Sequence, residues 1–61
     1  NINTATAVEL EELPGIGPKT ALRIVEWRKE HGKFQRVEDL MAVKGIGEKK
    51  MAQLKPLITV Q

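Results

Sequence analysis

Two short glycine-containing stretches decide the fold of this chain, and they repeat one pattern. Residues 13–21 read LPGIGPKTA and residues 43–51 read VKGIGEKKM, so Gly-Ile-Gly recurs thirty positions later. The correspondence continues outside the glycines, because Leu10 aligns with Leu40 and Leu54 aligns with Ile24. The sequence therefore predicts two copies of one structural unit.

Each unit is predicted to be a short helix, a Gly-x-Gly turn and a second helix. In the first unit, residues 6–9 have the form of a capping box, and Pro14-Gly15 ends the first helix because glycine permits a left-handed turn. Pro18 suits the first position of the next helix, and Gly32 suits its C-terminal cap. The apolar face of that helix is predicted at Ala21, Ile24, Val25 and Arg28, widened by Leu22 and Trp27.

The second unit shows the same order of signals. Its inward-facing residues are predicted to be Val37, Leu40 and Met41 before the turn, and Met51 and Leu54 after it. The last helix should stop near Lys55, because Pro56 follows. No segment alternates like a strand. We expect an all-α fold in one domain, residues 1–61: a small bundle of four to five short helices, with a first motif at about 6–31, a second at about 37–55, and pseudo-twofold symmetry.

The composition excludes several classes of protein. The chain has no cysteine and one histidine, which excludes a disulfide framework and a Cys/His zinc site. No apolar run approaches the roughly 20 residues of a membrane helix, so the chain as given is expected to be soluble. It begins at Asn1 without a methionine, which suggests an excised fragment or a mature form.

The net charge of +2 is unevenly distributed. Acidic residues precede each turn, and basic residues follow it. A helix N-terminus presents unpaired backbone N–H groups and attracts anions, and glycine lets an anion come close. Residues 15–17 and 45–47 have these properties, and Lys19, Lys49 and Lys50 lie within one turn of them. Two such sites on one small domain predict a polyanionic partner.

Residues 13–21 and 43–51 resemble the helix-hairpin-helix motif in its tandem form. Residues 1–5, 32–34 and 37–40 further resemble the C-terminal DNA-binding domain of the ComEA competence proteins. The resemblance implies sequence-independent binding of double-stranded DNA through phosphates at the minor groove, in DNA uptake during natural transformation. The site residues that it implies are Gly15, Ile16, Gly17, Lys19, Thr20, Gly45, Ile46, Gly47, Lys49 and Lys50.

The same resemblance implies a monomer at the cell envelope, on the periplasmic or extracellular face. Its partners would be double-stranded DNA and the DNA-uptake machinery, with the membrane reached only through an N-terminal anchor that this chain lacks. No cofactor or metal is expected, apart from a monovalent cation at a hairpin, which follows from the resemblance alone. Pro18 offers no N–H and Glu48 would repel a phosphate, so contacts through these two positions are not expected.

Two alternatives remain open at this point. The chain could be a structural or protein-interaction module of the same fold, or the DNA-targeting domain of a cytoplasmic repair enzyme. A nucleotide-binding loop is rejected because the glycine spacing is wrong and no strand precedes it. We expect no enzyme: His31 has no partner for catalysis, and the neighbouring acids at 11–12 and 38–39 should be solvated. Trp27 and Phe34 are assigned to the core, and Arg23, Lys29, Lys33 and Arg36 to the general surface.

Overall fold

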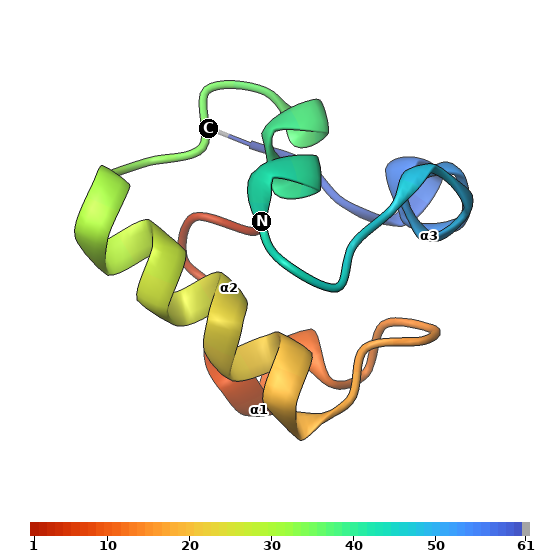
Figure 1. The fold of residues 1–61 in the computed structure, drawn as a ribbon, viewed down its shortest axis with the longest axis horizontal. Coiled ribbons are helices and arrows are strands. Elements are labelled where there is room, and N and C mark those ends of the chain that lie inside the picture. The colour runs from red at the N-terminus through yellow and green to blue at the C-terminus, as the bar shows by residue number, and fades with distance from the viewer. Residues whose placement is uncertain (61) are drawn as a thin grey trace.

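In the computed structural model, which describes residues 1–60, the chain folds into short helices packed around a single core (Figure 1). Residues 1–60 contain no strand, which confirms the expected all-α fold. None of their helices is long and apolar enough to span a membrane. The elements in chain order are α1 (Ala7–Leu10), α2 (Pro18–His31), the 3-10 helix η1 (Val37–Ala42), α3 (Glu48–Leu54) and the 3-10 helix η2 (Lys55–Leu57).

The predicted capping box starts α1. The Thr6 hydroxyl accepts a hydrogen bond from the Glu9 backbone N–H at 3.2 Å, and the Glu9 carboxylate accepts one from the Thr6 N–H at 2.8 Å. The bond from the Thr6 N–H, with the bond to the Thr6 side chain, lowers the pKa of Glu9. These bonds satisfy donors that a helix start would otherwise leave unpaired.

The longest helix, α2, begins at Pro18 and is capped by Gly32 at a φ of 85°, as the sequence predicts. Its buried face is narrower than expected, because Ala21 and Ile24 are fully buried whereas Leu22 is 56% exposed. The prediction that Leu22 faces the core is therefore wrong. Successive helical residues are about 100° apart, so a residue beside the buried row faces outward when neighbouring elements cover only one side.

The first helix of the second unit is a 3-10 helix, η1, rather than an α-helix. With three residues per turn, only positions three apart share a face. Leu40 is accordingly buried and Val37 is half-buried, while Met41 is 42% exposed, so the inward placement of Met41 is wrong. The Asp39 carboxylate caps η1 by accepting from the N–H groups of Gln35 and Arg36 at 3.0 and 3.2 Å, where a solvated acid was expected.

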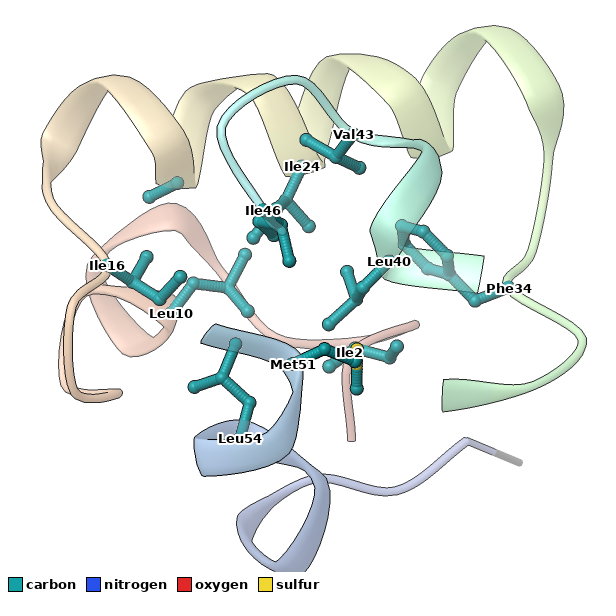
Figure 2. Close-up of a cluster of buried hydrophobic side chains, with 11 residues drawn as sticks. Ile2, Leu10, Ile16, Ile24, Phe34, Leu40, Val43, Ile46, Met51 and Leu54 are labelled. Atoms are coloured by element: carbon teal, nitrogen blue, oxygen red, sulfur yellow. The ribbon is translucent and has the colours of Figure 1, made fainter. Parts of the chain in front are cut away.

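Both units contribute equivalent residues to the core (Figure 2). The side chains in Figure 2 converge from α1, α2, η1 and α3 onto one interior. Met51 and Leu54 face inward as predicted, and α3 ends at Leu54 before Pro56. Residues aligned by the repeat occupy matching buried positions: Leu10 and Leu40, Ile16 and Ile46, Ala21 and Met51, Ile24 and Leu54.

The N-terminal segment belongs to the core. Ile2 is 1% exposed, and its N–H donates to the Thr59 carbonyl at 3.0 Å. The Asn3 side-chain amide pairs with the backbone of Phe34, accepting from its N–H at 2.7 Å and donating to its carbonyl at 3.0 Å. The Arg28 guanidinium donates to the carbonyls of Ile2 and Ala5 at 2.8 and 2.9 Å. Residues 1–5 are thus held in place by both side-chain and backbone bonds.

Candidate functional site

The two Gly-Ile-Gly turns have the same backbone structure. In the first turn the Ile16 N–H donates to the Leu13 carbonyl at 3.2 Å, and in the second the Ile46 N–H donates to the Val43 carbonyl at 3.2 Å. Gly15 has a φ of 78° and Gly45 a φ of 100°, values that only glycine adopts without strain. The left-handed turns expected from the sequence are therefore confirmed.

The second glycine of each turn has a different environment. Gly17 has φ −91° and ψ −179°, and Gly47 has φ −99° and ψ −174°, which is extended backbone open to any residue. A Cβ atom added at either position would meet nothing within 4 Å. Neither backbone conformation nor packing requires glycine here, and its effect is to leave the backbone open to the surface.

The two central isoleucines anchor the turns. Ile16 and Ile46 are each 4% exposed, and both side chains pack into the core. Their N–H groups donate within the turns, as described above. Backbone contacts to a ligand were predicted at both residues. A contact through either N–H group would have to break the hydrogen bond that this group already makes within the turn.

Unpaired backbone donors lie directly after each turn. Within residues 1–60, the N–H groups of Gly17, Lys19 and Thr20 donate to no protein acceptor. Pro18, which lies between them, has no backbone N–H group. Among the same described residues, the N–H groups of Gly47 and of residues 48–50 are also without an acceptor. Both turns therefore present several free donors beside an unobstructed glycine.

Side chains from each motif lie against the turn of the other. A Cβ atom placed on Gly15 would lie 3.2 Å from Lys50 Cε, so the stem of Lys50 runs along the first turn. A Cβ atom placed on Gly45 would lie 3.6 Å from Thr20 Oγ1 and 3.3 Å from Arg23 Nη1. Such reciprocal contacts are typical of a twofold relation between two units. The two turns are thus neighbours, linked by these side chains.

The cations near the turns are not neutralised by acids. Within residues 1–60 the ion pairs join Arg36 to Asp39 at 3.6 Å and Lys55 to Glu38 at 3.1 Å. A bond from its own backbone N–H, followed by the bond to Lys55, lowers the pKa of Glu38. Lys19 and Lys49 are exposed, whereas Thr20 and Lys50 are half-buried. The charge at the turns remains available to an anion.

No arrangement for metal binding or for base stacking is visible in the described part of the chain. Residues 1–60 contain no cluster of three or more His, Asp or Glu side chains able to hold a metal ion. A cation held by hairpin carbonyls stays a prediction of the family resemblance. The ring of Trp27 stacks on that of Phe34, with 4.5 Å between the ring centroids, and on that of His31, with 4.6 Å between them. This packing agrees with the assignment of Trp27 and Phe34 to the core.

Sequence reasoning assigned Arg23 to the general surface, where it lies, but did not predict that its guanidinium comes close to the second turn. In the thirty-residue alignment Arg23 matches Gln53, so the repeat gives no reason to place a cation there. The available signal was its helical position: Arg23 is three residues after Thr20 and therefore lies on the same side of α2. The predicted site residues all lie at the two turns or in the first turn of α2 or α3.

Residues 1–59 match the helix-hairpin-helix motif family, and the chain belongs to that family. Over all 61 residues it is 49% identical to ComE operon protein 1 of Bacillus subtilis, which confirms the likeness to the ComEA competence proteins. Over 55 residues, or 90% of the chain, it is 51% identical to the human endonuclease/exonuclease/phosphatase family domain-containing protein 1. The chain spans 30% of the length of the first relative and 10% of the second.

Proposed function

We propose that this chain binds double-stranded DNA by its phosphates, without reading base sequence, as the DNA-receptor domain of a competence protein. The observation that carries the proposal is the second glycine of each turn. Gly17 and Gly47 have ordinary extended backbones and open space around them, so the fold alone does not explain why a side chain is missing at both. Close approach of a ligand to the backbone does explain it.

The chemistry of the turns suits phosphate oxygens. Backbone N–H groups make short, charge-assisted bonds to phosphate, and a Cβ atom on the glycine would stand in the way. Lys19 and Lys49 add positive charge at an exposed position beside each turn. Binding of this kind is driven largely by counterion release and carries no direct sequence information.

A duplex fits these features better than a single strand. Two adjoining turns can each bind a phosphate. The reciprocal contacts at Gly15 and Gly45 indicate a twofold relation between the two turns, which matches the two strands of a duplex. Readers of single strands stack bases on exposed aromatic side chains. Here Trp27 and Phe34 stack on each other, and Phe34 is 2% exposed.

The relatives suggest two biological settings for the same binding. The likeness to ComE operon protein 1 over the whole chain favours a competence protein at the cell envelope, with the DNA-uptake machinery as its partner. The likeness to the human endonuclease/exonuclease/phosphatase family domain-containing protein 1 favours a DNA-targeting domain within a larger enzyme. The first is our proposal, because the identity extends over all 61 residues. In either setting this chain would bind and would not catalyse.

The test is a set of glycine-to-alanine variants that separates folding from binding. Gly17→Ala and Gly47→Ala should keep the fold and weaken duplex binding on the order of tenfold each and a hundredfold together, as expected for lost bonds to a charged group. Gly32→Ala is the matched control. Its φ of 85° makes alanine strained, but it lies at the far end of α2, about 20 Å from the turn. It should lower the thermal midpoint and leave affinity unchanged.

Affinity is measured by fluorescence anisotropy with one duplex, its scrambled sequence and the matching single strand, over a salt series. Equal affinity for both duplexes, weaker single-strand binding and a slope of log K against log[salt] between roughly −2 and −4 would support the phosphate contacts. Wild-type affinity in the Gly17→Ala/Gly47→Ala double variant would overturn the role of the turns. No binding by the wild type at low salt would favour the protein-interaction alternative.

A further inference from the structure

Each turn has a side chain from the other motif lying on its first glycine. Lys50, which follows the second turn in sequence, runs its stem along Gly15 of the first turn. Arg23, which follows the first turn, brings its guanidinium to Gly45 of the second turn, with Nη1 3.3 Å from the position of a Cβ atom there. The positive charge near each turn therefore comes partly from the opposite motif.

The two contacts are not made by residues that the repeat aligns. The counterpart of Lys50 is Thr20, which also reaches Gly45 but carries no charge. Three residues later on the same side of α2, Arg23 supplies the missing cation. The counterpart of Arg23 is Gln53, so the first turn has only Lys50 in this role. Arg23 thus lies beside the second turn as Lys50 lies beside the first, from a position one helical turn further along its helix.

We propose that Arg23 binds a DNA backbone phosphate at the second turn and that Lys50 binds one at the first, so that each phosphate site is completed by the opposite motif. This inference rests on the proposed function. Arg23 is exposed, and within residues 1–60 it forms no ion pair, so its donors are available. A guanidinium matches phosphate with two parallel N–H···O bonds.

The first test compares Arg23→Gln with Lys29→Gln. Lys29 is exposed on the same helix, carries the same charge and lies six residues further from the turns, on a different side of α2. Losing one phosphate contact should weaken duplex binding about five- to tenfold near 0.1 M salt and reduce the slope against log[salt] by about 0.9. Lys29→Gln should change affinity less than twofold, and Arg23→Lys should keep the wild-type slope. Thermal melts verify that all three variants stay folded.

The crossed arrangement has its own test, which combines these variants with the glycine variants. If Arg23 serves the second turn, Arg23→Gln should be non-additive with Gly47→Ala and additive with Gly17→Ala. Lys50→Gln should show the reverse pattern, since it serves the first turn. Additivity in all four combinations would overturn the crossed pairing.

The outcomes also separate this inference from the proposed function. If the wild type binds duplex and the glycine variants weaken it, but Arg23→Gln behaves like Lys29→Gln, Arg23 is a surface residue and the phosphate contacts at the turns stand without it. If the wild type does not bind duplex at low salt, both the proposed function and the role of Arg23 are wrong. A reduced slope in Arg23→Gln alone would support the assignment, because a merely structural role would not change it.

Discussion

The two helix-hairpin-helix motifs share one turn structure, but the helices on either side of the turn differ. Each turn closes through one N–H···O bond of 3.2 Å, at Ile16 and at Ile46. The first turn joins α1 to a 14-residue α2, whereas the second joins a 3-10 helix to a seven-residue α3. Because the turn is unchanged, its geometry is set by its own glycines and its buried isoleucine. The type and length of the flanking helices are free to vary.

The motifs also differ in the residues just after the turn. Pro18 and Thr20 follow the first turn, where Glu48 and Lys50 follow the second. These positions do not shape the backbone, since Gly17 and Gly47 have nearly the same dihedral angles. They set the charge near each turn instead. The fold is therefore duplicated, while the binding surface is not.

The largest effects should come from the paired core leucines. Leu10 and Leu40 are 2% and 0% exposed, so Leu10→Ala and Leu40→Ala should each lower the free energy of unfolding by about 2–5 kcal/mol. If the core is shared equally, the two losses agree within about 1 kcal/mol although one residue lies in α1 and the other in a 3-10 helix. Urea denaturation followed by circular dichroism measures both. Met41→Ala, at an exposed position, is the control with little change.

A smaller effect is expected at the first glycine of each turn. Gly15→Ala and Gly45→Ala should lower the free energy of unfolding by about 1–2 kcal/mol, because both glycines have positive φ. Gly17→Ser, at an extended N-cap position, should leave it unchanged or raise it. The same denaturation experiment compares the three variants. Equal losses at Gly15 and Gly17 would contradict the distinction between the two glycines.

Acid should weaken both motifs, through a different contact in each. Glu9, in the capping box of the first motif, and Glu38, paired with Lys55 in the second, both have lowered pKa values. Their contribution to stability is therefore present above the ordinary pKa of 4.5 and is lost as the pH falls through the lowered value. The thermal midpoint should drop below pH 4.5, and Glu9→Gln and Glu38→Gln should each flatten that drop. A profile unchanged by Glu9→Gln would exclude the capping box as its cause.

Much of the fold could be predicted from the sequence because its signals are local. The capping box at Thr6, the helix start at Pro18 and the glycine cap at Gly32 each depend on the chemistry of a few adjacent residues. The repeat adds a long-range constraint, since matching positions such as Ile16 and Ile46 are buried in both copies. The turns and the repeated part of the core could therefore be predicted from the sequence alone.

The remaining features depend on contacts between distant segments. The outward position of Leu22 follows from which side of α2 is covered, and the exposure of Met41 follows from the 3-10 geometry of η1. The contact of Arg23 with Gly45 joins the two motifs and breaks the repeat. Local patterns carry no information on such contacts. The predicted site residues were located from the turns, and the position of Arg23 beside the second turn was not predicted for this reason.

The smallest effect concerns the acid at the second turn. Glu48 is exposed in the first turn of α3, next to Gly47, where its carboxylate would repel a bound phosphate. Glu48→Gln should strengthen duplex binding roughly two- to fivefold at low salt, as expected for removing one like charge through water at several ångströms. The thermal midpoint should fall slightly, because an acid is favourable at a helix N-terminus.

The matched control for this variant is Glu30→Gln, which removes the same charge from an exposed position near the C-terminal end of α2. Anisotropy at two salt concentrations compares the two variants, and the gain in Glu48→Gln should shrink at the higher salt. Equal gains in both variants would reflect net charge alone and place Glu48 outside the binding surface. A gain confined to Glu48→Gln would locate a phosphate at the second turn. At the first turn the matching residue is Pro18, which has no charge to repel a phosphate.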